Sequence, residues 1–297
     1  MNSDLLRRWE LLSSSDAAPG ADLELALWQD QIGLLTVSSA ASRPHEHYRL
    51  RFADQASVDV FTARKQIQES QPSPGVPHDT RDHFLADQVL PRIIAHEGQL
   101  VLHGAAVRVG ACAIVILGES GQGKSTLAAS FAQAGLPLLG DDAMVVVQRD
   151  GRTMVKAVYP SLRLLPDSID ALYAEAPDAA SVAHYSPKRR IPLPVATDGG
   201  EAELAMIVAL APPGAGGAVV AERLSVAQSC VALITNSFAL DPTDMERARA
   251  KLAAASACAA RVPAFAISYP RDYARLPDVR AAMLDRLDQV RGAAEDR

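Results

Sequence analysis

The stretch GESGQGKST, residues 118–126, decides the expected fold, because it fits the pattern G-x-x-x-x-G-K-[ST] in full. An apolar run, ACAIVIL, precedes it at 111–117, and a helical pattern follows it. Glycines allow backbone conformations that turn successive N–H groups toward one anion, and the N-terminus of a following helix adds a positive dipole end. The stretch therefore predicts a loop that holds the phosphates of a nucleoside triphosphate.

Two side chains of this loop have specific expected roles. Lys124 would reach the β- and γ-phosphates as a point charge, and the Ser125 hydroxyl would coordinate Mg²⁺. The residues expected to contact the nucleotide form one continuous set: Gly118, Glu119, Ser120, Gly121, Gln122, Gly123, Lys124, Ser125 and Thr126.

An acidic pair, Asp141-Asp142, follows the loop. A helix of about ten residues from Ser125 would rise about 15 Å, and LPLLGDD at 136–142 would return as a strand of roughly 20 Å. Both carboxylates then reach the phosphates at the carboxyl end of a parallel strand. Because neighbouring strand residues point in different directions, one aspartate can hold Mg²⁺ while the other acts as a base. The alternative is a pair that merely begins a turn.

A histidine precedes the loop in the same predicted hairpin. The runs LVLHGAAV at 100–107 and ACAIVIL are separated by Arg108-Val109-Gly110, which favours two antiparallel strands joined by a short turn. That register would place His103 opposite a residue close to Val115. A histidine there can orient a carboxylate or share a proton, and the alternative is a buried histidine satisfied by the backbone.

The remaining patterns predict an α/β protein with two parts. Short alternating runs at 22–62 indicate a small antiparallel sheet, and QESQPSPGVPHDTRD at 68–82 has the composition of a linker. We therefore expect a small N-terminal β-rich module with its linker at 1–82 and a second domain at 83–297. The second domain should contain strands and helices in alternation: a helix at 83–98 kinked or broken at Pro91, strands at 143–147, 154–159 and 204–210, a helix capped by Asp241, and a last amphipathic helix with Val279, Met283, Leu287 and Val290 on its apolar face.

Composition excludes several classes of protein. The 297 residues are 48% hydrophobic, which is enough for a real core, and the net charge of −6 arises from 29 basic and 35 acidic residues interspersed along the chain. The sequence has no cluster of basic residues of the kind that binds nucleic acid. Cys112, Cys230 and Cys258 lie far apart in apolar surroundings, which favours buried reduced thiols. No signal-type core or membrane-length apolar stretch is visible, so we expect a cytoplasmic protein without a membrane partner.

Taken together, LHGAAV, GESGQGKST and GLPLLGDDAMVVV resemble the HPr kinase/phosphorylase superfamily in its C-terminal kinase domain. The likeness in order and spacing covers 102–147. It implies the HPr-kinase/PEP-carboxykinase type of P-loop kinase core and transfer of the γ-phosphoryl group of ATP, with Mg²⁺, to a serine hydroxyl of a protein or peptide. By position, His103 matches the family's catalytic histidine and Asp141-Asp142 its acidic pair. We assign Asp141 as the base and Asp142 as metal-associated. The resemblance also implies a possible homo-oligomer.

The sequence departs from the bifunctional members of that superfamily at two places. Thr126 stands where those proteins have an acidic residue, and KAVYPSLRLLPDSI at 156–169 lacks their later glutamate- and arginine-containing signature. Phosphorylase activity and a sugar-regulatory role are therefore not expected.

Four other segments are similar to HPr-kinase-like proteins of ribosomal peptide maturation, including those of lasso-peptide gene clusters. They extend the likeness over roughly 82–285: DHFLADQVLPRIIAHEGQLVLHGAAV, YPSLRLLPDSI, SPKRRIPLP and VPAFAISYPRDYARLPDVR. This second resemblance implies that the substrate is a ribosomally made precursor peptide.

One basic cluster and several rival functions stay open. Lys188, Arg189 and Arg190 are candidates for a mobile loop that closes on phosphate or on an acidic peptide, and the alternative is a solvated basic turn. An HPr-type phosphocarrier protein serine kinase, a small-molecule kinase and a nucleotide-dependent switch or ATPase would use the same phosphate loop. A peptide-binding scaffold with a vestigial loop is the non-enzymatic alternative.

Overall fold

The computed structural model describes residues 8–12, 24–29, 35–40, 45–53, 56–69, 75–193, 200–213 and 217–295. It is a mixed α/β structure with two compact units, one formed by Met1–Gly98 with Ala239–Ala250 and the other by Gln99–Phe238 with Lys251–Arg297. Part of the predicted linker, 70–74, lies outside the described residues.

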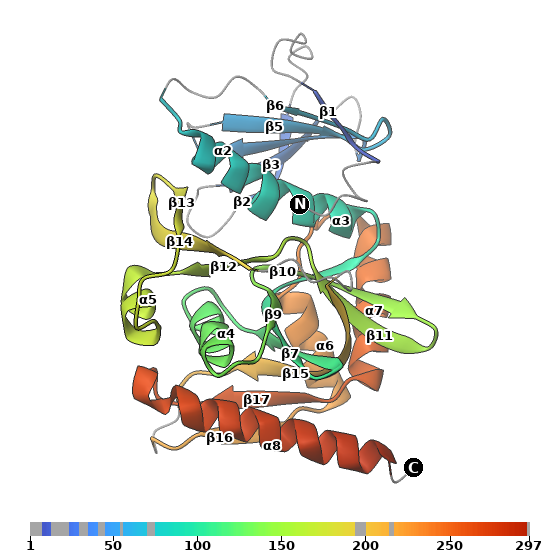
Figure 1. The fold of residues 1–297 in the computed structure, drawn as a ribbon. Helices are drawn as coiled ribbons and strands as arrows, with labels where there is room; N and C mark the ends of the chain where they lie inside the picture. The colour runs from blue at the N-terminus through green and yellow to red at the C-terminus, as the bar shows by residue number, and fades with distance from the viewer. Residues whose placement is uncertain are drawn as a thin grey trace. The chain divides into compact units, whose positions relative to one another are not determined.

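A six-stranded sheet forms the first unit, in the order β1-β6-β5-β4-β3-β2 (Figure 1). All neighbours are antiparallel except β1 and β6, so the predicted antiparallel sheet is confirmed. Alternate residues such as Tyr48, Leu50 and Phe52 are buried, as expected for a sheet with one covered face. The strands are β1 (Glu10–Leu12), β2 (Glu24–Gln29), β3 (Leu35–Ala40), β4 (His47–Phe52), β5 (Ala56–Phe61) and β6 (Gln66–Glu69).

A continuous helical run covers this sheet: α2 (His78–His83), the π-helical η1 (Phe84–Val89) and α3 (Leu90–His96). The ring of Phe84 stacks on Phe52 with centroids 4.1 Å apart, and Ile93 is buried in the same core. The boundary expected near residue 82 falls within this run, and the units divide after Gly98 because the helices pack on the sheet. We expected a kink or a break at Pro91, and the helical run continues through this residue without a break. Proline lacks the N–H that an α-helix needs there, and a π-helical segment precedes it.

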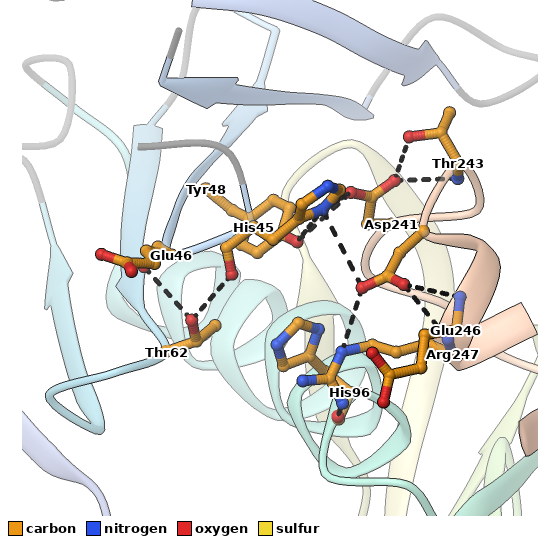
Figure 2. A network of polar contacts seen from close by, with 10 residues as sticks. His45, Glu46, Tyr48, Thr62, His96, Asp241, Thr243, Glu246 and Arg247 are labelled. Carbon is orange, nitrogen blue, oxygen red and sulfur yellow. Dashed lines mark hydrogen bonds and ion pairs between the residues drawn. The ribbon is translucent and has the colours of Figure 1, made fainter. Parts of the chain in front are cut away.

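Residues 239–250 join the first unit through a network of polar contacts (Figure 2). Tyr48 donates a hydrogen bond to Asp241 Oδ2 at 3.2 Å, and His45 Nδ1 lies 3.1 Å from the same oxygen. The expectation that Asp241 caps the next helix is wrong. Asp241 accepts hydrogen bonds from Thr243, whereas the carboxylate of Asp244 accepts the backbone N–H groups at the start of α7 (Met245–Arg261).

The second unit is built on a larger sheet with the strand order β11-β10-β7-β8-β15-β17-β16. The predicted hairpin is present, with Gly104 opposite Leu117, and β8 and β17 both run parallel to β15. The strands are β7 (Leu100–Val109), β8 (Cys112–Leu117), β9 (Leu138–Gly140), β10 (Ala143–Arg149), β11 (Arg152–Ala157), β15 (Glu201–Leu210), β16 (Val220–Arg223) and β17 (Ala264–Ser268).

Helices cover both faces of this sheet. Ile114 and Ile116 of β8 pack with α4 (Lys124–Gln133) and α8 (Leu276–Glu295), while Val115 packs with α6 (Val226–Thr235) and the second part of α7. Strand β8 is therefore buried on both faces, which explains its unbroken apolar sequence. Val279, Met283 and Leu287 of α8 are fully buried, as the amphipathic pattern predicted.

A smaller three-stranded sheet, in the order β12-β14-β13, packs against α4 together with α5 (Pro166–Leu172). Its strands are β12 (Ser161–Leu164), β13 (Ala180–Ala183) and β14 (Ser186–Pro192), and a short 3₁₀ turn, η2 (Tyr273–Arg275), precedes α8. The cysteines are free thiols, but only Cys258 is buried. Within the described ranges, no helix is both long and apolar enough to cross a lipid bilayer.

Candidate phosphate-binding site

The loop at 118–126 connects β8 to α4, as its sequence predicted. Gly118, Gly121 and Gly123 have φ values of +152°, +84° and +86°, a region that favours glycine. A Cβ on Gly118 would lie 2.5 Å from the Gln122 side chain. The loop conformation thus depends on its glycines, and it ends where α4 begins at Lys124.

Lys124 is folded back onto the loop. Its Nζ donates hydrogen bonds to the carbonyl oxygens of Gly118 at 2.7 Å and Glu119 at 3.0 Å, and the side chain is buried. Burial lowers the pKa of this ammonium, and the nearby charges of Asp141 and Asp142 oppose that effect. A phosphate would give Lys124 a negatively charged partner in place of two neutral carbonyl groups.

Asp141 lies against the beginning of α4. The Ser125 hydroxyl is close enough to lower the pKa of this carboxylate, and Arg163 donates its backbone N–H to Oδ2 at 3.2 Å. Complete burial raises the pKa of Asp141 despite the nearby Arg163 guanidinium. A hydroxyl and a carboxylate side by side are the hard oxygen ligands that Mg²⁺ prefers. Among the described residues, no group of three or more His, Cys, Asp or Glu side chains is arranged to hold a metal ion.

Asp142 has a different set of partners. Its Oδ1 lies 3.2 Å from His103 Nδ1 and contacts the Arg163 guanidinium, while Tyr159 donates a hydrogen bond to Oδ2 at 3.1 Å. Burial by itself raises the pKa of Asp142, but Arg163, His103 and Lys188 hold it well below its ordinary value. The residue also has φ of +79°, a strained conformation for a non-glycine side chain that often occurs at functional sites. The structure therefore presents Asp142 as a buried, ionised carboxylate.

The predicted approach of the acidic pair to the loop is found, but the strand that delivers it differs. Strand β9 is only three residues long and pairs antiparallel with β7, with Gly140 opposite Ala106. Strand β9 therefore runs in the same direction as β8, as expected, but β7 lies between the two and pairs antiparallel with both. A Cβ on Gly140 would lie 2.5 Å from Cβ of Ala157, so glycine permits this close passage.

His103 lies nearer the phosphate loop than the predicted strand register placed it. Val115 pairs with Ala106, and His103 pairs instead with Ala143 on β10, next to Asp142. The edge of its ring meets Phe238, with centroids 5.8 Å apart. His103 is about one-third exposed, so its imidazole joins Asp142 to solvent-accessible space.

Thr126 connects the loop to α5. Its hydroxyl lies 3.0 Å from Ser168 Oγ, which in turn lies 3.2 Å from the hydroxyl of Tyr273. These residues line a cavity of about 190 Å³ beside Gly121 and Gly123. Arg271 also lines this cavity, with its guanidinium 4.3 Å from the ring centre of Tyr269.

The basic cluster lies on a strand and not on the loop that we expected. Lys188, Arg189 and Arg190 belong to β14, where pairing with β12 and β13 fixes the backbone. Lys188 is close enough to influence the charges of Lys124 and Asp142, Arg190 lies over the ring of Tyr159 at 5.7 Å, and Arg189 is exposed.

Sequence reasoning missed three residues of this site. Arg163 and Tyr159 bind Asp142, and Asn236 accepts a hydrogen bond from the backbone N–H of Gly118 at 3.1 Å. The backbone carbonyl of Asn236 also accepts the N–H of His103 at 2.6 Å, which ties the histidine to the loop. An arginine within the apolar run SLRLL was the available signal for Arg163, because buried arginines usually have charged partners.

No protein-family model matches the chain. Two proteins named HPr kinase/phosphorylase, from Lacticaseibacillus casei and Lacticaseibacillus paracasei, are each 39% identical over 61 residues, which is 20% of this chain. The match spans only about a fifth (19%) of the length of these relatives. The structure of the Hpr(Ser) kinase/phosphatase from Coxiella burnetii covers 64% of this chain and 97% of its own, with a TM-score of 0.34 and 12% identity. The chain thus has weak homology to HPr kinase/phosphorylases, restricted to one segment of 61 residues.

Proposed function

We propose that this protein is an ATP-dependent kinase that transfers the γ-phosphoryl group to a serine hydroxyl of a peptide or protein. One observation carries the proposal: two buried aspartates lie at the phosphate loop with separate partners, Asp141 on Ser125 and Asp142 on His103. A protein that only binds a nucleotide needs no second carboxylate of this kind. The weak homology to HPr kinase/phosphorylases agrees with serine as the acceptor.

In this proposal, the loop N–H groups and Lys124 bind the phosphates. Ser125 and Asp141 would hold Mg²⁺, which would supply positive charge against the phosphate oxygens. Lys124 would release the carbonyl oxygens of Gly118 and Glu119 and turn to the phosphates. The cavity beside Thr126 and Arg271 would take the nucleoside, with Arg271 free to stack on the base as it now stacks on Tyr269.

We assign the two aspartates roles that are the reverse of those expected from the sequence. Asp142 contacts His103, whose side chain is about one-third exposed and connects it to solvent-accessible space, so we assign Asp142 as the acceptor of the serine proton. As the serine oxygen bonds to the γ-phosphorus, the bond to the bridging oxygen of ADP breaks and the proton passes to Asp142. His103 positions this carboxylate, and Arg163 with Lys188 supplies positive charge beside the transferred group.

For the acceptor, we propose a ribosomally made precursor peptide of the lasso type. The support is the resemblance of four segments within 82–285 to HPr-kinase-like proteins of peptide maturation. Thr126 agrees with a dedicated kinase, because it uses its hydroxyl to contact Ser168 and offers no carboxylate for a reverse reaction.

The test is incubation with γ-labelled ATP and Mg²⁺, in parallel with the precursor peptide encoded nearest the gene and with the phosphocarrier protein HPr, followed by mass spectrometry. A peptide with alanine in place of each serine is the matched control. The proposal expects a mass increase of about 80 Da, one phosphoryl group, on the serine peptide only. Label released only as free phosphate would indicate an ATPase, and label on the phosphocarrier HPr but not on the peptide would indicate the HPr-type alternative.

A further inference from the structure

A second cavity lies in the same unit, away from the phosphate loop. It has a volume of about 760 Å³ and is formed between β16, the start of α6, the end of α7 and α8. None of its lining residues belongs to the loop at 118–126 or to the Asp141-Asp142 pair. We call this cavity the β16 groove.

Positive charge dominates the β16 groove. Its charged lining residues are Arg223, Arg261 and Arg286, and no aspartate or glutamate lines it. Arg223 and Arg261 are exposed, and within the described residues neither guanidinium forms a hydrogen bond or ion pair. The net charge of the protein is −6, whereas the lining of this cavity contains three arginines and no acidic residue.

Arg286 is fixed at the wall of the groove by contacts of its guanidinium. Its guanidinium donates to Gln289 Oε1 at 2.8 Å and to the Ala221 carbonyl at 3.4 Å, and it lies 6.0 Å from the ring centre of Phe265. These contacts fix a half-buried cation at the wall of the groove. The conformational entropy of the Arg286 side chain is therefore already reduced before a ligand binds. Helix α6 also begins in this wall, and its positive dipole end adds to the field.

The shape and apolar surface of the groove favour an extended peptide over a small anion. Strand β16 is the terminal strand of the sheet and offers an outer edge for another extended segment. Val226 is 56% exposed at one wall, and Val220, at the start of β16, is 43% exposed. A volume of about 760 Å³ holds several residues, which is far more than a phosphate ion needs.

We propose that the β16 groove binds an extended acidic peptide segment of a partner. Alternate carboxylates of the segment pair with the three arginines, and its apolar side chains contact Leu224 and Val226. The site is distinct from the phosphate loop and does not depend on the proposed phosphoryl transfer.

The test uses fluorescence anisotropy with a fluorescein-labelled peptide of eight residues in which glutamate and valine alternate. The control probe has glutamine at each glutamate position, and a single-stranded RNA oligonucleotide of eight nucleotides tests for a general polyanion. We expect the acidic peptide to bind more tightly than both controls and to weaken as salt rises from 0.05 to 0.5 M. Equal binding of the glutamine peptide, or tighter binding of the RNA, would overturn the proposal.

Variants locate the binding. Reversing two charges, Arg223→Glu with Arg261→Glu, should weaken the peptide about a hundredfold, or about 2.8 kcal/mol at 1.4 kcal/mol per tenfold change. The matched control, Arg152→Glu with Arg249→Glu, makes the same charge change outside the groove and should leave the Kd within about threefold. Equal losses in the two double variants would contradict a groove site. The Lys124→Ala protein should bind the peptide normally, so peptide binding in the groove is tested independently of kinase activity.

Discussion

The buried pair formed by Arg163 and Asp142 predicts how much stability the protein should lose when Arg163 is replaced. Both side chains are less than 10% exposed. Opposite charges about 4 Å apart interact by about 4 kcal/mol at an effective dielectric constant of 20, and removing one partner of a buried pair typically costs about 3–5 kcal/mol. Arg163→Gln should therefore lower the free energy of unfolding by about 4 kcal/mol at pH 7. The exposed Arg152→Gln, whose guanidinium lies 3.5 Å from Glu203, should change it by less than about 1 kcal/mol.

The loss of stability in the Arg163→Gln variant should also depend on pH. In the native protein Arg163 helps to hold the pKa of Asp142 below its ordinary value of 3.8, so the ionised form stabilises the fold above that pH. Without Arg163, burial should raise the pKa above 3.8, and protonation should then relieve part of the cost. The difference between variant and wild type should shrink between pH 7 and pH 4.

The assay is urea unfolding followed by circular dichroism, arranged as a double-mutant cycle with Asp142→Asn. If the pair is coupled as its geometry indicates, the loss of unfolding free energy in the double variant should be smaller than the sum of the two single-variant losses by at least 2 kcal/mol. Additivity within about 0.5 kcal/mol would refute the reasoning, since the two side chains would then act independently.

Three further changes test other parts of the molecule. Lys124→Ala should reduce phosphoryl transfer at least a hundredfold, measured with labelled ATP, and equal turnover would exclude Lys124 from phosphate stabilisation. Arg271→Ala should raise the KM for ATP several-fold with little change in kcat, and an unchanged KM would remove the cavity at Tyr269 from the nucleoside site. Burial lowers the pKa of His96 to about 4 from 6.5, so stability should fall by up to about 3 kcal/mol as pH drops from 6.5 to 4. His96→Phe, which keeps a ring against Tyr48, should reduce that loss in urea titrations, and an equal loss would point to other groups.

Local sequence predicted the centre of the site well. The hairpin, the glycine-dependent loop and α4 follow from short-range rules of strand pattern, backbone freedom and helix formation. The return of Asp141-Asp142 to the loop followed from the lengths of α4 and the segment after it. These features depend on residues within about 25 positions of Lys124.

Features that depend on distant residues could not be predicted in the same way. Arg163 reaches Asp142 only because β12 packs beside α4, and Asn236 reaches Gly118 from the end of α6. The positive φ of Asp142 is also indicated by no spacing rule. Likewise, 239–250 belongs to the first unit through contacts of Asp241 with Tyr48 and His45, nearly 200 positions earlier in the chain.

The most direct test of the central claim compares Asp142→Asn with Asp141→Asn in transfer from γ-labelled ATP to a serine peptide, with nucleotide affinity measured by calorimetry. Asp142→Asn should abolish phosphopeptide formation while the Kd for ATP with Mg²⁺ stays within about threefold of wild type. Asp141→Asn should weaken the binding of ATP that depends on Mg²⁺. Phosphopeptide formation by Asp142→Asn at the wild-type rate would contradict Asp142 as the proton acceptor.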